Sequence, residues 1–254
     1  MQTSLRGIAE QARKDKRRRF TNLAQLLTYQ YLAENFSILN KKAATGIDGV
    51  THRGYAKDLK ENITKLLERV RTGRYRARFV RRKHIKKANG KLRPLGIPTI
   101  EDKLLQAAVS RILSEIYEQD FSKASYGYRK GRGPKEAVRA LTDQLKEKYS
   151  YVVEADIKGF FDHLDHEWLM KMLDLRVGDG TIKRLIRKWL KAGVVAEDGH
   201  VFKPVEGTPQ GGVISPILAN IYLHYVLDLW FEKEIKENCD GESYLIRFAD
   251  DFVA

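Results

Sequence analysis

Apolar residues recur every three or four positions along much of this chain, a spacing that places them on one face of a helix. Proline also favours the first turn of a helix, where its missing N–H has no intrahelical partner. The pattern predicts helices within 20–39, 55–70 and 104–116, after Gly133-Pro134, from Asp165, in TIKRLIRKWL and after Ser215-Pro216.

Shorter stretches have the character of strands. From 71 to 100 there is no acidic residue, basic and apolar residues alternate, and ANGK supplies turn chemistry, so we predict a basic β-hairpin from about 77 to 97. Further strands are predicted in YVVEADI, around VFKPVEG and in SYLIRFADD. With the intervening helices, their order is close to the split β-α-β plan of a ferredoxin-like sheet, which gives an α+β fold class.

Composition narrows the class of protein. The chain has 254 residues, of which 43% are hydrophobic, enough for one large core or two smaller lobes. Its 47 lysines and arginines outnumber 33 acidic residues, and the net charge of +14 suits a polyanionic partner or a merely basic soluble protein. Cys239 is the single cysteine, which excludes an intramolecular disulfide framework and fits a reducing, intracellular location.

One apolar run resembles a membrane span. Within GVISPILANIYLHYVLDLWF, however, Asn220, His224 and Asp228 recur every four positions and form one polar stripe on a helix. This pattern favours a buried helix that lines a polar site over a helix that faces lipid. Residues 1–30 contain no apolar run of the length of a signal peptide, so no membrane partner is expected.

Three carboxylates mark a candidate catalytic site. Asp156 lies near the end of one predicted strand, and Asp250 and Asp251 lie at the end of another. If both strands belong to one antiparallel sheet, the carboxylates converge and repel each other unless cations join them. Two Mg²⁺ ions would resolve this repulsion and could promote an in-line phosphoryl displacement. The alternative is a solvated turn or a helix cap, against which the flanking apolar residues argue.

Five motifs in one order indicate a family. NGKLRPLGIPTIEDKLLQ, SYGYRKGRGPKEA, EADIKGFFDHLDHEWL, GTPQGGVISPILANIYL and RFADDFV resemble those of the group II intron type of reverse transcriptase, the intron-encoded maturases. TGIDGV resembles the N-terminal extension of that family, so the resemblance covers roughly 45–254. Phe248 stands where the family usually has tyrosine, and Lys86 and Lys130 stand where it often has proline.

The resemblance implies roles for individual residues. Asp156, Asp250 and Asp251, with the main-chain carbonyl of Ile157, would bind two Mg²⁺ ions, or Mn²⁺ in their place. Phe160 would exclude a ribose 2′-hydroxyl, with a core role for it or Phe161 as the alternative. The residues implied to bind the incoming nucleotide are Arg81, Lys87, Arg93, Gln210 and, as an alternative, Lys91.

Two basic runs are candidates for nucleic-acid contacts. RKDKRRR contains Arg17, Arg18 and Arg19, with a solvated charged helix as the alternative interpretation. GYRKGRG lacks the spacing of a phosphate-binding loop and is interpreted as a template contact, with a turn and helix cap as the alternative. Its basic residues are Arg129, Lys130 and Arg132.

Taken together, these observations predict the fingers and palm of a reverse transcriptase. The expected division is 1–75 for an N-terminal helical extension, 76–150 for the fingers and 151–254 for a palm with a ferredoxin-like sheet, and part of 118–150 can be counted with the palm. The expected activity is RNA-directed DNA synthesis by two-metal nucleotidyl transfer, with an intron RNA-binding, maturase role in splicing and retrohoming.

The alternatives are a splicing maturase without polymerase activity, and a group II-like reverse transcriptase used in defence or diversification. Expected partners are group II intron RNA, an RNA template with a DNA primer, and dNTPs. The sequence does not indicate whether the protein forms a homodimer. The expected location is the bacterial cytoplasm, with an organelle as the alternative. Because the chain stops three residues after Asp251, the palm reads as truncated, and we expect these 254 residues to bind RNA but to polymerise poorly.

Overall fold

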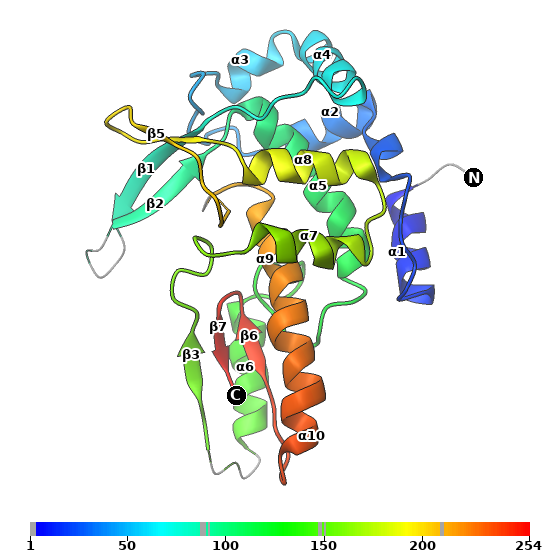
Figure 1. Cartoon of the computed structure of the whole chain (residues 1–254), viewed down its shortest axis with the longest axis vertical. Helices are drawn as coiled ribbons and strands as arrows, with labels where there is room; N and C mark the ends of the chain where they lie inside the picture. Colours follow the sequence, from blue (N-terminus) through cyan, green and yellow to red (C-terminus); the bar gives the residue numbers. More distant parts are fainter. Residues whose placement is uncertain (1–3, 87–89, 91, 147–148, 150, 209–210) are drawn as a thin grey trace.

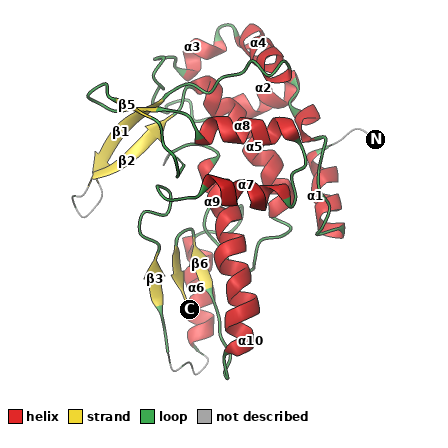
Figure 2. Ribbon diagram, in the orientation of Figure 1, coloured by secondary structure: helices red, strands yellow, loops and turns green. Residues whose placement is uncertain are grey.

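The computed structural model has an upper helical part that carries a projecting β-hairpin and a lower part built on a small sheet (Figure 1). It describes residues 4–86, 90, 92–146, 149, 151–208 and 211–254. Figure 2 shows that helices account for most of the regular structure. The helices are α1 Leu5–Lys14, α2 Tyr29–Ile38, α3 His52–Ala56, α4 Leu59–Arg71, α5 Ile100–Tyr117, α6 Pro134–Leu145, α7 His166–Asp174, α8 Gly180–Leu190, α9 Ser215–Leu223 and α10 Lys236–Asn238. The strands are β1 Val80–Lys86, β2 Leu92–Ile97, β3 Glu154–Asp156, β4 Val194–Val195, β5 Val201–Phe202, β6 Ile246–Phe248 and β7 Asp251–Val253.

The helices begin where local side chains satisfy their free N–H groups. The Asp165 carboxylate accepts a hydrogen bond from Trp168 N at 2.8 Å, as expected for the residue preceding α7. Thr99 caps α5 by accepting from Asp102 N at 3.2 Å. At α6, Pro134 occupies the first turn and Glu136 accepts from Gly133 N at 2.8 Å. The predicted helices are therefore confirmed, and capping chemistry sets the starts of α5, α6 and α7.

One large hydrophobic core joins the two parts of the molecule, and a small second cluster of Val80, Ala192 and Val194 lies beside the hairpin sheet. The centre of the large core is α5, whose residues Leu104, Leu105 and Ile112 are fully buried. The large core extends from Ile8 in α1 to Leu245 in the lower part. Burial of this much apolar side chain is the main source of stability for a fold of this kind.

The predicted hairpin is confirmed, but its sheet is larger than expected. β1 and β2 pair antiparallel, and Arg81 lies opposite Ile97. β1 also pairs parallel with β4, and β4 pairs antiparallel with β5, which gives the order β2-β1-β4-β5. The stretch around 201–206 therefore extends the hairpin sheet, because its strand pairs with the adjacent β4, and it is not a strand of the lower sheet.

The lower sheet has the order β3-β7-β6, and both of its strand pairs are antiparallel. Helix α6 and the long helix that begins at α9 lie alongside this sheet (Figure 1). The α+β fold class is therefore confirmed, with a three-stranded antiparallel sheet among helices.

The long helix contains the predicted polar stripe. After α9 it continues through π-helical turns at His224–Asp228 and Phe231–Ile235, and Asn220, His224 and Asp228 are all buried. π-Helical turns shift the register of side chains and are frequent at functional sites. In the described part of the chain, no helix combines the length and the apolar character that crossing a membrane requires.

Candidate active site

The antiparallel pairing of β3 with β7 brings the predicted carboxylates together. In its register, Asp156 lies directly opposite Asp251, and Asp250 precedes Asp251 in the β6–β7 turn. The turn is tied to β3 by a hydrogen bond of 3.3 Å from Ile157 N to Asp250 O. Residues directly opposite in an antiparallel pair have Cβ atoms about 4.5–5.5 Å apart. Carboxylates from two segments that are distant in sequence therefore lie together at one end of the β3–β7 strand pair.

Negative charge accumulates at this end of the sheet. Desolvation, and then the negative charges of Asp156 and Asp250, raise the pKa of Asp251. Each cause penalises the ionised carboxylate. A divalent cation is the group that would relieve both penalties, since carboxylate oxygens are the ligands Mg²⁺ prefers.

The described residues fit a Mg²⁺ site of the sparse type. They contain no cluster of three or more His, Cys, Asp or Glu side chains arranged to hold one ion. Mg²⁺ nevertheless typically uses only one or two carboxylates and completes its coordination with water and substrate phosphate. The carbonyl of Ile157 accepts from Phe160 N at 3.2 Å, and a carbonyl oxygen has a second lone pair.

Tyr128 belongs to this site, although no sequence pattern distinguishes it from its basic neighbours. Burial and then the charge of Asp250 raise its pKa, and Arg93 opposes the shift. The ring is half exposed and meets Phe161 edge-on at 6.5 Å. Its backbone is left-handed, with φ of 57°, an uncommon conformation for a residue other than glycine. Tyr128 is thus within electrostatic reach of both the hairpin arginine and the carboxylates.

The hairpin residues expected to bind nucleotide have different surroundings. Arg93 is on β2, within electrostatic reach of Tyr128. Arg81 is on β1, where its Nη2 donates to the carbonyl of Thr45 at 2.5 Å, so it also anchors the TGIDGV segment. Its Nε is buried and has no hydrogen-bond partner among the described residues. Lys87 and Lys91 lie outside the described residues.

Phe160 and Phe161 are both buried, each with 6% of its surface exposed, and both belong to the main core. Their rings meet edge-on at 5.5 Å, and Phe160 also packs against Tyr222. The core interpretation therefore applies to both rings. A role for Phe160 in excluding a 2′-hydroxyl stays a prediction.

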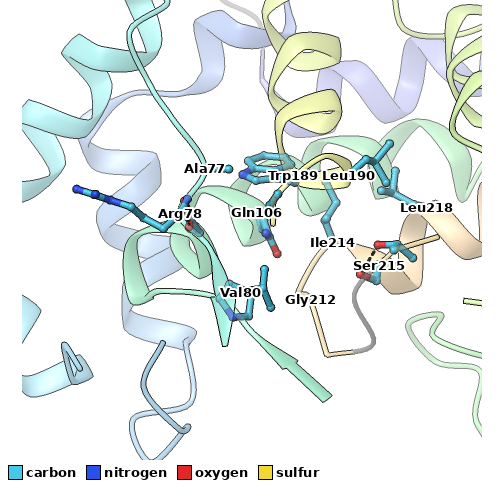
Figure 3. Close-up of a pocket in the computed structure, with 14 residues that line it drawn as sticks. Ala77, Arg78, Val80, Gln106, Trp189, Leu190, Gly212, Ile214, Ser215 and Leu218 are labelled. Atoms are coloured by element: carbon cyan, nitrogen blue, oxygen red, sulfur yellow. Dashed lines mark hydrogen bonds between the residues drawn. The ribbon is translucent and has the colours of Figure 1, made fainter. Parts of the chain in front are cut away.

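Gln210 also lies outside the described residues, but the anchors on each side of it are visible. A small internal pocket lies where β1, α5 and the 212–215 segment meet, with Gln106 between them (Figure 3). Gln106 accepts from Val213 N at 3.0 Å, and the hydroxyls of Thr208 and Ser215 bond at 2.8 Å. These polar anchors fix both ends of the GTPQGG loop.

Gly211 supplies close packing rather than mere flexibility. Its φ is +102°, and a Cβ there would lie 2.9 Å from the carbonyl oxygen of Gly96 in β2. Glycine is needed because any side chain would collide with the hairpin backbone. The backbone that approaches Gly211 closely is thus that of the hairpin.

Two of the predicted template contacts have structural roles. Arg129 is almost buried, pairs with Glu118 at 2.9 Å and donates to the carbonyls of Ser122 and Ser125. Arg132 donates to the carbonyl of Lys123 at 2.7 Å and stacks over Tyr126. Their guanidinium groups hold the 122–132 loop together. Lys130, the third cation of this run, is exposed and makes no bond of this kind among the contacts of the described residues.

The N-terminal arginines are on the surface. Arg19 pairs with Asp174 at 3.2 Å, and Arg18 lies over the ring of Phe20. Arg17 is exposed. None of the three contributes a side-chain contact to the carboxylate site among the contacts described.

Helix α8 has a basic face that the sequence analysis treated only as part of a helix. Its lysines and arginines are Lys183, Arg184, Arg187 and Lys188, and Lys191 follows directly. No acidic residue lies between 180 and 191. Desolvation, and then the charges of Arg76 and Arg184, lower the pKa of Lys188, so like charges crowd this face. The sequence does contain a signal for this basic face, namely a helical segment with several cations and no acidic residue.

Comparisons with known proteins agree on one family. The model of the family described as "Reverse transcriptase (RNA-dependent DNA polymerase)" matches residues 85–254. The group II intron-encoded protein LtrA of Lactococcus lactis subsp. cremoris is 41% identical over 218 residues, which cover 84% of this chain and 35% of LtrA. The chain thus spans about a third of the length of that relative.

Two further relatives extend the comparison. Protein YkfC of Escherichia coli (strain K12) is 35% identical over 282 residues, covering 98% of this chain and 74% of YkfC. Among solved structures, a chain of a partial Cas6-RT-Cas1–Cas2 complex superposes with a TM-score of 0.57 at 26% identity. That alignment covers 92% of this chain and 38% of the other.

Proposed function

The chain belongs to the reverse transcriptase (RNA-dependent DNA polymerase) family, and we propose that the intact protein synthesises DNA on an RNA template at the end of the β3–β7 strand pair where the aspartates lie. The observation that carries the proposal is the register that sets Asp156 opposite Asp251, with Asp250 beside it. Similarity to LtrA supports a protein of the group II intron-encoded type. We propose the division into an N-terminal extension, fingers and palm given by the sequence.

In this mechanism the side chains of Asp156, Asp250 and Asp251 would hold two Mg²⁺ ions, with the Ile157 carbonyl as a further ligand. When bound, the ions would stabilise the attacking 3′-oxygen of the primer and the leaving pyrophosphate oxygen of the dNTP. The raised pKa of Asp251 supports this assignment, because its ionised form is unfavourable in the metal-free site and would be stabilised by a bound cation.

Residues from the hairpin and the core would bind the nucleotide. Arg93, on β2 and within electrostatic reach of Tyr128, would pair with the triphosphate, together with Lys87 and Lys91. Arg81 would combine this role with its bond to Thr45. Phe160 and Gln210 are proposed to contact the sugar of the dNTP.

Substitution of the carboxylates tests the polymerase proposal. In the intact protein, Asp250→Ala or Asp251→Ala should abolish Mg²⁺-dependent DNA synthesis on an RNA template. RNA affinity should stay nearly unchanged, because these carboxylates would bind metal rather than RNA. Asp240→Ala, which removes an exposed carboxylate elsewhere, is the control. Synthesis that persists without Asp250 or Asp251 would overturn the site assignment.

Intron RNA is the second proposed partner, in a maturase role. The observation in its favour is the acid-free basic face of α8, with the exposed arginines 17–19 as further candidates. Binding through phosphates should weaken steeply as salt rises. An affinity for intron RNA that does not change with salt would contradict this role.

A role in host defence is the alternative with structural support. The reverse transcriptase of the Cas6-RT-Cas1–Cas2 complex has a similar fold at 26% identity. The intron-encoded type is favoured because LtrA, a group II intron-encoded protein, is more similar, at 41% identity. LtrA and YkfC are bacterial, which supports a cytoplasmic location in a bacterium.

A further inference from the structure

Arg247 is a fully buried cation three residues before Asp250. Its side chain has 0% of its surface exposed, as has that of its partner Asp228 in the long helix. Nε and Nη2 bind the two oxygens of Asp228 at 2.6 and 2.7 Å, the forked geometry that arginine forms with a carboxylate. Its charge is thus neutralised within the fold.

The other hydrogen bonds of this guanidinium reach the catalytic turn and its supports. Nη1 donates to the carbonyl of Ala249, inside the turn, at 3.0 Å. Nη1 also donates to Asn220 at 3.2 Å, and Nη2 donates to the hydroxyl of Ser125 at 2.9 Å. One side chain therefore connects the turn, the long helix and the 124–127 segment.

The backbone of the same segments is joined in parallel. Arg247 N donates to the Ala124 carbonyl and Tyr126 N donates to the Arg247 carbonyl, both at 2.8 Å. Asn220 Nδ2 donates to the Gly127 carbonyl at 2.8 Å. The long helix, which binds Arg247 through Asn220 and Asp228, thereby also holds the segment that presents Tyr128.

Two left-handed residues meet at this junction. Ala249 has φ of 58° and Tyr128 has φ of 57°, and both are residues for which this conformation costs free energy. A Cβ at Gly127 would lie 2.3 Å from Ala249 N, so the two backbones touch at the glycine. Such conformations persist only where the surroundings impose them, and they cluster at functional sites.

We propose that Arg247 is a positioning residue, which holds the Ala249–Asp251 turn and the Gly127–Tyr128 segment in the one arrangement that directs the carboxylates and Tyr128 at the same substrate. This inference rests on the proposed polymerase function. It differs from a stabilising role, because a buried ion pair can often be replaced by apolar residues without loss of stability.

The test replaces the ion pair as a unit in the intact protein. Arg247→Met with Asp228→Leu removes both charges and keeps similar volumes, but removes the donor to the Ala249 carbonyl. The matched control is Arg176→Met with Asp120→Leu, which removes another Arg–Asp pair at 3.0 Å, with Arg176 buried against α1. The measurements are kcat and KM for dNTP incorporation, the Mg²⁺ concentration for half-maximal rate, RNA affinity and thermal unfolding with and without Mg²⁺.

We expect the Arg247 pair variant to lose roughly 100-fold in kcat, since a shift of about 1 Å in a catalytic group can cost that much. Its half-maximal Mg²⁺ concentration should rise severalfold, and its RNA affinity should change less than about twofold, because the RNA surface is untouched. The control pair variant should keep both kinetic values within about threefold. A folded Arg247 pair variant with unchanged kcat and Mg²⁺ dependence would overturn the inference, as would an equal loss in the control.

Two further measurements cover the remaining outcomes. If the pair variant does not fold, Ser125→Ala and Asn220→Ala take its place, since each removes one bond to Arg247. In each variant kcat should fall while the RNA affinity stays unchanged. An unchanged kcat in both would overturn the inference. If the unaltered protein makes no DNA, the polymerase proposal fails. The inference is then decided by the Mg²⁺-induced rise in melting temperature, which should be absent from the Arg247 variants and would contradict it if retained.

Discussion

At the scale of single residues, His224 is the clearest source of pH dependence. Burial lowers its pKa to about 4, and Arg247, Arg129 and Lys16 oppose protonation, while Asp228 favours it. In the unfolded chain His224 takes up a proton near pH 6.5. In the folded protein it stays neutral until the pH approaches 4. Stability from this residue is therefore complete above pH 6.5 and is lost as pH falls towards 4.

We expect this loss to reach about 3 kcal/mol in the free energy of unfolding. His224→Phe keeps a ring beside Phe121, which the imidazole contacts edge-on at 5.7 Å, and removes the titrating group. Urea unfolding between pH 7 and pH 4 should show a smaller loss in the variant than in the unaltered protein. Parallel pH profiles for the two proteins would contradict the assignment.

Asp251 is expected to destabilise the metal-free fold and to contribute to metal binding. Because desolvation and neighbouring carboxylates penalise its charge, Asp251→Asn should raise the melting temperature of the metal-free protein. The rise should be roughly 1–2 °C, since screened charges interact weakly and 1 kcal/mol corresponds to about 2–4 °C at this size. With Mg²⁺ the unaltered protein should gain stability and the variant should gain less. Asp240→Asn, measured in the same scans, should change neither value, and a lower metal-free melting temperature in Asp251→Asn would count against the prediction.

The sequence was sufficient to predict which carboxylates come together, because local strand periodicity determines their positions. Asp156 and the Asp250-Asp251 pair stand out because each ends a strand-like apolar run, and the structure does bring Asp156 opposite Asp251. Arg247 does not stand out, because its partners lie 19, 27 and 122 residues away along the chain. Residue chemistry is thus predictable where strand periodicity sets the neighbours, and unpredictable where tertiary contacts do.

At the scale of elements, periodicity and capping predict the helices and the hairpin well. They do not predict which sheet a short strand joins, because β4 and β5 have two residues each, and the pairing of β4 with β1 and of β5 with β4 depends on tertiary contacts. Periodicity also misses the π-helical turns in the long helix. Periodicity also does not show the internal bonds of the 129–132 loop, because Arg129 and Arg132 find carbonyl partners that only the folded loop creates.

Helix α8 is the element expected to bind RNA phosphates. The triple substitution Arg184→Gln, Arg187→Gln and Lys191→Gln removes three exposed cations from one face. If each contacts a phosphate, the slope of log K against log salt should become shallower by about 2–3. Electrophoretic or fluorescence titrations with structured intron RNA at several salt concentrations measure this slope.

A matched variant separates this face from net charge. Lys41→Gln, Lys57→Gln and Lys60→Gln remove the same charge from exposed positions before and within α4. This variant should keep nearly the full salt dependence, because only contacted phosphates release counterions. Equal slopes for the two triple variants would show that α8 acts only through the net charge of the protein.

At the scale of the whole molecule, the continuous core determines how the upper and lower parts unfold. The cluster that contains α5 also includes Phe231 and Leu245, and the Arg247–Asp228 pair lies in the lower part of the same interior. Since no boundary interrupts this core among the described residues, both parts should unfold in one cooperative transition.

Breaking the buried ion pair tests this cooperativity. Asp228→Ala leaves Arg247 buried without its counter-charge, which typically costs about 3–5 kcal/mol, and should lower the melting temperature by on the order of 10 °C. Hydrogen exchange followed by mass spectrometry across a urea titration reports separately on peptides from α5 and from β6–β7. Both sets should shift to lower urea by the same amount, although the substitution lies near only the second. If β6–β7 opened first while α5 kept its original midpoint, the sheet that carries the carboxylates would be a separate folding unit, and Arg247 would act on the active site through local stability alone.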